Sequence, residues 1–291
     1  MFIEWGMKTY FYDSKEIRWR LPSRERLFHR LGEYDTMAEF TVLSERYFER
    51  LCNDAESYVE FVNAKAIEYD VKIRAGVSLD NYREALYKSF MVNSTAMFDD
   101  FVENFKEDMK IFVDHSFSLY DSSSLSKYER LKKSMENAGY NLKIPKWLHD
   151  IVIYYRLVRN HVAHNQGDEE KCSKMFEKID LKQMCKDYPV FINKSPNPPG
   201  KITMDDFYLF SASIKHIANL FTISIQGKEN WYDIGKYHPS LQRSRIPSGK
   251  DRRKLVCKII NELGVRCEKD LVDGILENVR QQYNPEITST T

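Results

Sequence analysis

The chain has 291 residues, of which 42% are hydrophobic and 30% are charged, and its 44 basic and 43 acidic side chains give a net charge of +1. A chain of this length can bury a sizeable core, and this hydrophobic content excludes a disordered protein. Only 11 glycines and 9 prolines argue against a turn-rich all-β architecture. The near-zero net charge excludes a globally basic nucleic-acid coat, although a local basic groove remains compatible with it.

The cysteines and the apolar stretches indicate the cellular compartment of the protein. The 5 cysteines are odd in number and never in C-x-x-C spacing, which predicts reduced thiols rather than a disulfide framework or a zinc site. The N-terminal residues lack the apolar segment of a signal peptide, and the longest nearly apolar stretch, 217–225, is too short to span a bilayer. We therefore expect a cytoplasmic protein with no membrane partner, no cofactor and no metal.

Two long helices are expected in the first part of the chain. Residues 1–34 show no clear period and are treated as a cap of uncertain structure. From residue 36, apolar residues recur at three-, four- and seven-residue steps, which predicts an amphipathic helix over 36–69. A second long helix is expected over 80–113. The apolar stripe of the first helix consists of Phe40, Leu43, Tyr47, Leu51, Tyr58 and Val62.

Two further helices are expected in the middle of the chain. Segment 121–141 opens with serines suited to N-capping and ends near Gly139, which predicts a third, more polar helix. Pro145 stands where a first-turn proline is tolerated, and the apolar stripe after it predicts a helix that ends near residue 164. Its Val158 and Val162 are expected to face the core.

The last part of the chain adds one core helix and a basic extension. The proline-rich stretch 188–203 predicts an extended loop with a short edge strand at 190–193. A core helix follows over 203–226, with Phe207, Phe210 and Phe221 on its buried side. Beyond it the chain becomes basic, with two shorter helices expected over 251–263 and 268–283. The sequence thus predicts an all-α bundle over 35–226 and a basic helical extension over 227–291.

The segment YYRLVRNHVAHNQGD holds the residues best suited to chemistry. At 100° per residue, Arg156, Asn160 and His164 lie on one helix face, with Arg159 and His161 beside them. A guanidinium can hold a phosphate oxygen and stabilise the extra charge of a pentacoordinate transition state. An imidazole can take or give a proton near neutral pH, and an asparagine can orient it or the substrate. This combination suits phosphodiester chemistry.

The run Arg159-Asn160-His161-Val162-Ala163-His164 resembles the RNxxxH form of the Rx4-6H motif of the HEPN superfamily. These are all-α ribonuclease domains of toxin–antitoxin, RNA-processing and anti-phage systems. The expected helix over 80–113, with its NSTAMFDDFVENF core, resembles their long earlier helix. The resemblance covers about 35–226. It implies a metal-independent endoribonuclease that attacks with the RNA 2′-hydroxyl and leaves a 2′,3′-cyclic phosphate.

The resemblance also implies partners and residue roles. It implies a homodimer whose two motif helices face each other across one cleft, in a toxin or antiviral defence setting with a possible antitoxin or activating partner protein. By match to the motif, Arg159 is the phosphate and transition-state ligand, Asn160 the orienting amide and His164 the acid–base residue. Asp99 is the candidate acid of the earlier helix, with Asp100 competing for this role. The residues expected to contact RNA are Arg156, His161, Arg252 and Arg253.

Simpler interpretations stand beside these. The motif residues also fit a solvated helix end, and the basic run around Arg252 and Arg253 also fits a flexible, solubilising hinge. His161 and His164 have a spacing that could chelate a metal, but no third ligand follows at a suitable distance along the chain. The alternative function is a non-catalytic HEPN-type scaffold that binds a partner protein or a nucleotide. The acids Asp99, Asp100, Glu103, Glu107 and Asp108 are most simply a solvated helix face.

Overall fold

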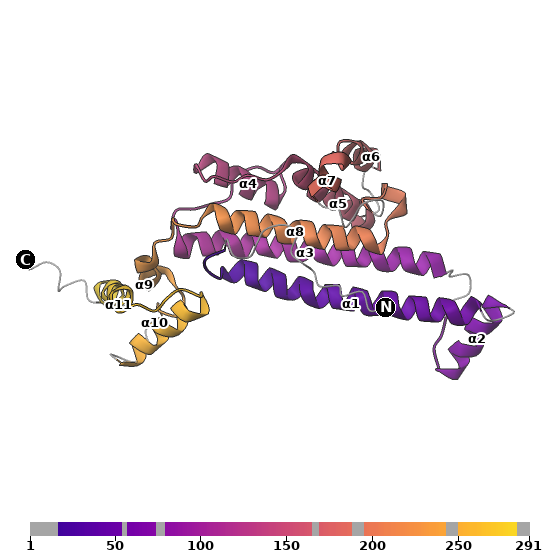
Figure 1. Ribbon diagram of the computed structural model, residues 1–291, viewed down its shortest axis with the longest axis horizontal. Coiled ribbons are helices and arrows are strands. Elements are labelled where there is room, and N and C mark those ends of the chain that lie inside the picture. The colour runs from indigo at the N-terminus through magenta and orange to yellow at the C-terminus, as the bar shows by residue number, and fades with distance from the viewer. Residues whose placement is uncertain are drawn as a thin grey trace, which may run out of the picture. The chain divides into compact units, whose positions relative to one another are not determined.

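The computed structural model describes residues 17–53, 57–73, 79–164, 169–187, 195–242 and 250–283, and all regular secondary structure in these ranges is helical (Figure 1). The prediction of an all-α fold is therefore confirmed. None of the helices in these ranges is long and apolar enough to cross a membrane. The α-helices are α1 (Pro22–Asn53), α2 (Tyr58–Glu68), α3 (Leu79–Phe112), α4 (Lys127–Asn137), α5 (Lys146–His164), α6 (Glu169–Glu177), α7 (Leu181–Asp187), α8 (Met204–Ser224), α9 (Ile234–Tyr237), α10 (Lys250–Glu262) and α11 (Lys269–Tyr283), with 3-10 turns η3 (Pro199–Lys201) and η4 (Trp231–Asp233).

The helices α3, α4, α5, α8, α10 and α11 begin and end close to the predicted positions. The start of α4 shows why. Ser126 accepts a hydrogen bond from the Glu129 amide (3.1 Å) and its own amide donates to the Glu129 carboxylate (3.0 Å), which forms a capping box. Gly139 follows the helix with a φ of 73°, a left-handed conformation that glycine adopts without strain. The predicted edge strand at 190–193 lies outside the described residues.

The chain forms two compact units, and α1, α3 and α8 contribute residues to both. Unit 1 comprises Met1–Phe28, Phe98–Ile144 and Lys215–Thr291, and unit 2 comprises His29–Met97 and Pro145–Ile214. Each unit is therefore assembled from segments that are distant in the sequence.

Aromatic side chains form the core of each unit. In unit 2, the Phe90 ring of α3 packs against Phe207 of α8, with ring centroids 5.1 Å apart. In unit 1, Phe105 of α3 packs against Phe221 of α8 at 5.4 Å, and Phe98 packs against Tyr128 of α4 at 5.5 Å. The expectation that the aromatic residues of α8 belong to the core is confirmed, since Phe207, Phe210 and Phe221 are at most 1% exposed.

The first long helix differs from its prediction. It begins at Pro22, within the segment treated as an uncertain cap, and ends at Asn53, and α2 is a separate helix. Much of the apolar stripe predicted for this helix is exposed, since Phe40, Leu43 and Tyr47 are 65%, 64% and 66% exposed. The face of α1 that is buried carries smaller and acidic residues instead, namely Leu27, Leu31, Asp35, Ala38, Glu45 and Cys52.

The two acids on the buried face of α1 explain this choice of face. The Asp35 carboxylate accepts a hydrogen bond from the Ser211 hydroxyl of α8 (2.8 Å). Glu45 accepts one from the Tyr87 hydroxyl of α3 (2.9 Å) and lies 4.0 Å from the Arg83 guanidinium. Buried carboxylates are tolerated when such partners satisfy them. Only Oε2 of Glu45 has these contacts, and Glu45 Oε1 has no hydrogen-bond partner in the described part of the chain. Period alone does not reveal partners that come from other helices, so it does not show which face of α1 is buried.

Candidate active site on helix α5

Helix α5 carries the predicted motif and is anchored in unit 2 by its N-terminal half. Trp147, Leu148, Ile151 and Val152 are at most 2% exposed. The Trp147 indole donates a hydrogen bond to the Asp187 carboxylate of α7 (2.8 Å). This half of the helix thus forms a fixed base from which the motif residues project.

A buried polar network holds the middle of α5 against the start of α8. The Asp206 carboxylate, which is 0% exposed, accepts hydrogen bonds from the Tyr155 hydroxyl (2.8 Å) and the Thr203 amide (2.8 Å). The backbone and side-chain amides of Asn197 also donate to it, each at 2.8 Å. Burial, followed by the charge of Asp206, raises the pKa of Tyr155 well above its ordinary value, so the phenol remains a donor. Tyr154 adds a hydrogen bond to the Asn197 carbonyl.

Arg159 and Asn160 form the centre of the motif. Both side chains are half-buried, and Arg159 Nη1 donates a hydrogen bond to Asn160 Oδ1 (2.9 Å). Arg159 Nε is buried and has no hydrogen-bond partner in the described part of the chain, where no carboxylate forms an ion pair with this guanidinium either. A buried donor without a partner costs about 1–3 kcal/mol. An anionic oxygen would satisfy it, and guanidinium groups bind carboxylates and phosphates with two parallel hydrogen bonds.

The rest of the motif surrounds this pair. Arg156 and His161 are half-buried, and Val158 is only 1% exposed, as expected for a core-facing residue. Val162 was also expected in the core but is only half-buried. Helix α5 ends at His164, and the side chain of His164 lies outside the described part of the structure. Its spacing of four residues from Asn160 places the two on one face of the helix.

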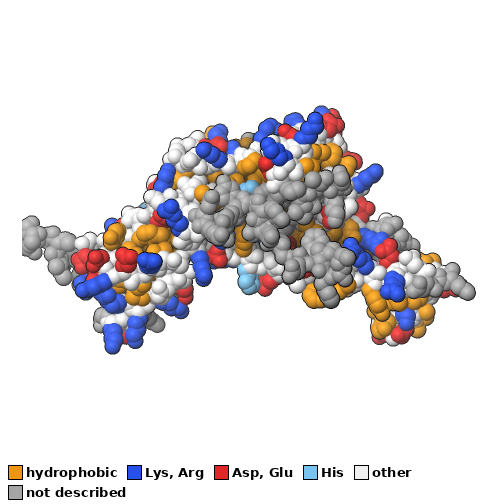
Figure 2. Space-filling view, in the orientation of Figure 1, with side chains coloured by type: hydrophobic (Ala, Val, Ile, Leu, Met, Phe, Trp, Pro, Cys, Tyr) orange, Lys and Arg blue, Asp and Glu red, His pale blue; other side chains and the backbone are white. Residues whose placement is uncertain are grey.

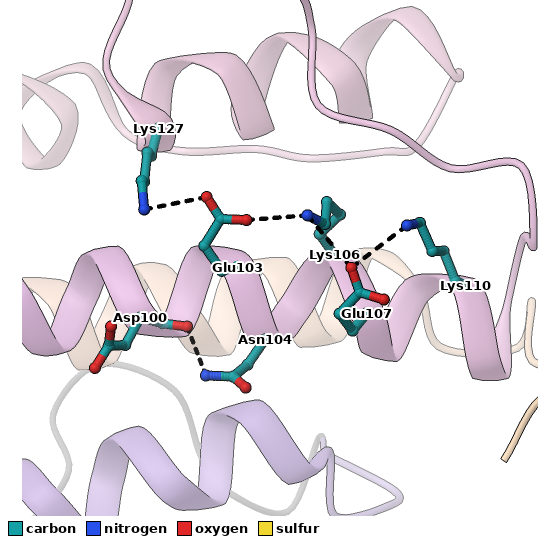
Figure 3. A network of polar contacts seen from close by, with 7 residues as sticks. All are labelled: Asp100, Glu103, Asn104, Lys106, Glu107, Lys110 and Lys127. Atoms are coloured by element: carbon teal, nitrogen blue, oxygen red, sulfur yellow. Dashed lines mark hydrogen bonds and ion pairs between the residues drawn. The ribbon is translucent and has the colours of Figure 1, made fainter. Parts of the chain in front are cut away.

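The acids proposed from the earlier helix belong to unit 1, whereas the motif belongs to unit 2. Asp99 is half-buried and Asp100 is exposed. Figure 3 shows the neighbouring face of α3, where Glu103 lies between Lys106 (3.0 Å) and Lys127 of α4 (3.1 Å). The hydrogen bond from Lys106 is the largest influence that lowers the pKa of Glu103. This face is an ion-paired helix surface, and the role of Asp99 remains a prediction.

The interpretation of Asp108 as part of that solvated face is wrong. Asp108 is 7% exposed, and its carboxylate accepts a hydrogen bond from the Ser23 amide of α1 (2.8 Å). The first amides of a helix lack partners within the helix, so Asp108 caps the N-terminus of α1 from the neighbouring α3. Sequence distance hid this role, because the two residues are 85 positions apart.

The predicted RNA contacts Arg252 and Arg253 lie on α10 in unit 1, in a different unit from α5. Both are half-buried, and Arg253 forms an ion pair with Asp273 of α11. Sequence reasoning missed Arg20, which the structure brings to the end of α10. The Arg20 amide donates a hydrogen bond to the Leu263 carbonyl (2.7 Å), a pairing that no local pattern signals.

Comparison of the chain with protein-family models, with curated proteins and with solved structures found no match. Within the described residues, no group of three or more His, Cys, Asp or Glu side chains is arranged to hold a metal ion. Any chemistry at this site therefore depends on the residues of α5 themselves.

Proposed function

We propose that this protein is a metal-independent endoribonuclease of the HEPN type that acts as a homodimer. The single observation that carries the proposal is the Arg159 guanidinium, which is half-buried, is held by Asn160 and has a buried Nε without a partner among the described residues. A solvated helix end would leave this nitrogen in water. In a phosphate-binding site, a phosphate oxygen accepts a hydrogen bond from this nitrogen.

The proposed reaction divides its work between two residues. Arg159 binds a non-bridging oxygen of the scissile phosphate and stabilises the charge that develops on it. The ribose 2′-oxygen forms a bond to phosphorus, and the bond from phosphorus to the 5′-oxygen of the next nucleotide breaks. An imidazole of His164 takes the proton from the 2′-hydroxyl, and an imidazolium returns one to the 5′-oxygen. The products are a 2′,3′-cyclic phosphate and a 5′-hydroxyl.

The other motif residues have supporting roles in the proposal. Asn160 holds the Arg159 guanidinium through their hydrogen bond (2.9 Å), and Arg156 and His161 contact neighbouring parts of the RNA. In the proposed homodimer, two copies of α5 face each other across one cleft. Asp99 is the proposed acid of the earlier helix. From the family resemblance, we also propose a toxin or antiviral defence role that is controlled by an antitoxin or an activating partner protein.

The test compares RNA cleavage in EDTA by the wild type with cleavage by Arg159→Ala and His164→Ala. Both variants are expected to lose cleavage while their circular dichroism and oligomeric state remain those of the wild type. Lys174→Ala is the matched control, since Lys174 is a cation of α6 in the same unit whose side chain is 65% exposed. Cleavage by Arg159→Ala at the wild-type rate would refute the assigned site.

A partner-binding scaffold is the second candidate, and the exposed apolar surface of unit 2 favours it. Most of the exposed large hydrophobic side chains among the described residues fall between 37 and 82, including Phe40 (65%), Tyr47 (66%) and Ile67 (82%). Hydrophobic side chains are visible on the surface of α2 in Figure 2. Patches of this kind mark protein interaction sites. The scaffold predicts no cleavage by the wild type and weaker partner capture after Phe40→Ser and Tyr47→Ser.

A further inference from the structure

The surface of unit 1 contains an open hollow lined mainly by cations. Its basic side chains are Arg20, Lys250, Arg253, Lys254 and Lys258, and Glu262 is the only acid that lines it. We refer to this feature as the basic hollow. Figure 2 shows Lys and Arg side chains gathered over α10 and α11, at the lower left of the view. A concentration of one charge sign in a hollow attracts ligands of the opposite sign.

The packing of α10 produces this arrangement. Val256, Ile259 and Ile260 are at most 5% exposed, so this side of the helix faces the core of unit 1. Lys250, Lys254 and Lys258 recur at every fourth residue and therefore form one row on the surface, about 6 Å apart along the helix axis.

Arg20 completes the hollow from the other end of the chain. Its amide donates to the Leu263 carbonyl (2.7 Å), directly after the end of α10. Its side chain passes along Gly264, where a Cβ would lie 3.5 Å from Arg20 Cγ. The preceding Trp19 is buried and packs against Trp231 with ring centroids 5.1 Å apart, which fixes the segment that carries Arg20. The cationic surface is therefore a product of the fold and not only of one basic run.

Lys254 and Lys258 remain available to an external anion, whereas Arg253 is ion-paired with Asp273 of α11. Lys254 pairs with Asp251 and Lys258 pairs with Glu262, each at 3.8 Å, and all four side chains are more than 60% exposed. Exposed ion pairs of this kind contribute about 0–1 kcal/mol. A phosphate can replace such partners at small cost.

A row of charges favours a linear polyanion over a single phosphate group. No large hydrophobic side chain of α10 or α11 is exposed among the described residues. This surface therefore favours nucleic acid over an anionic membrane. Peripheral membrane helices bind by burying such side chains in the bilayer. We propose that the basic hollow binds the sugar-phosphate backbone of a nucleic-acid strand, independently of base sequence. This binding does not require the α5 motif to be catalytic.

The test measures binding of the full-length protein to a fluorescein-labelled 2′-O-methyl RNA 20-mer of mixed sequence, which lacks the attacking hydroxyl. The variant is the triple change Lys250→Gln, Lys254→Gln and Lys258→Gln. The control is Lys110→Gln, Lys132→Gln and Lys143→Gln, which alters the net charge equally within unit 1 but leaves the basic hollow intact. Urea unfolding shows whether both variants remain folded.

The triple variant is expected to bind at least tenfold more weakly than the wild type. Loss of three phosphate contacts should also reduce the slope of log affinity against log salt by about 2. The control should bind as the wild type does. Equal weakening of both triple variants, or no binding by the wild type, would overturn the proposal.

Two further comparisons separate the possible causes. Binding to vesicles of phosphatidylserine and phosphatidylcholine that is lost in the Lys250/Lys254/Lys258 variant, with 20-mer binding unchanged, would assign the basic hollow to membranes and refute the proposal. Cleavage of unmodified RNA in EDTA tests the α5 motif separately, because the 2′-O-methyl 20-mer lacks the attacking hydroxyl and reports binding alone. A failure of the ribonuclease proposal is thereby distinguished from a failure of this one.

Discussion

Asp108 is expected to make the protein less stable as the pH rises. Its carboxyl is 7% exposed and accepts the Ser23 amide of α1 (2.8 Å). Burial raises the pKa of Asp108 to about 6 from an ordinary value of 3.8, although the Ser23 hydrogen bond and the charge of Arg26 act in the opposite direction. The folded state therefore holds this proton more tightly than the unfolded state does.

The sign and size of the effect follow from this difference. Between about pH 4 and pH 6 the folded protein keeps the proton and the unfolded chain releases it, so stability falls as pH rises through this window and then levels off. At about 1.4 kcal/mol per pKa unit, the rise from 3.8 to about 6 corresponds to about 3 kcal/mol. The positive end of the α1 dipole favours the charged form by up to about 2 kcal/mol, so the net loss is about 1–3 kcal/mol.

Asp108→Asn removes the ionisable group and keeps an oxygen for the Ser23 amide. The variant should match the wild type near pH 4 and should be more stable by about 1–3 kcal/mol at pH 8. Urea unfolding at several pH values measures this, with fluorescence of Trp19 and Trp231 in unit 1 as the probe. Asp108→Ala is the control, since it leaves the Ser23 amide unsatisfied at every pH. If Asp108→Asn is less stable than the wild type at pH 8, the carboxylate is stabilising and the reasoning is refuted.

Further predictions concern the packing of each unit. Gly235→Ala should destabilise unit 1 by about 1–3 kcal/mol, because the new Cβ would lie 2.6 Å from the Ile275 carbonyl oxygen. Gly32→Ala should instead stabilise α1 by about 0.5–1 kcal/mol, because no atom lies within 4 Å of the new Cβ. Equal changes in the free energy of urea unfolding for the two variants would contradict both predictions. Tyr155→Phe should cost about 1–2 kcal/mol because Asp206 loses one of its donors. Urea unfolding monitored by the fluorescence of Trp147 in unit 2 measures this. A free energy of unfolding equal to that of the wild type would show that this network does not hold α5.

The parts of the fold that could be predicted from the sequence depend on interactions between residues close together in the chain. The capping box of Ser126 and Glu129, the left-handed Gly139 and the apolar stripe of α5 all act within a few residues, so they are visible in the sequence. These signals predict α4 in unit 1 and α5 in unit 2. They also place Arg159 beside Asn160, because neighbouring helical positions are fixed by helix geometry.

The features that were not predictable depend on contacts between distant segments. The exposure of Phe40 reflects which face of α1 meets α3 and α8, and periodicity does not choose between two possible faces. The burial of Asp108 depends on Ser23, and the basic hollow depends on Arg20 reaching the end of α10. The burial of Arg159 Nε is likewise not specified by the helix pattern of α5.

The most direct measurement of the central claim is cleavage of a mixed-sequence RNA in EDTA, beside its 2′-O-methyl counterpart, by the wild type and by His164→Ala. We predict that the wild type cleaves only the RNA and leaves 2′,3′-cyclic phosphate ends, and that His164→Ala leaves both strands intact. Cleavage of the 2′-O-methyl strand, products with 3′-hydroxyl ends, or equal cleavage by His164→Ala would contradict the proposed chemistry of α5.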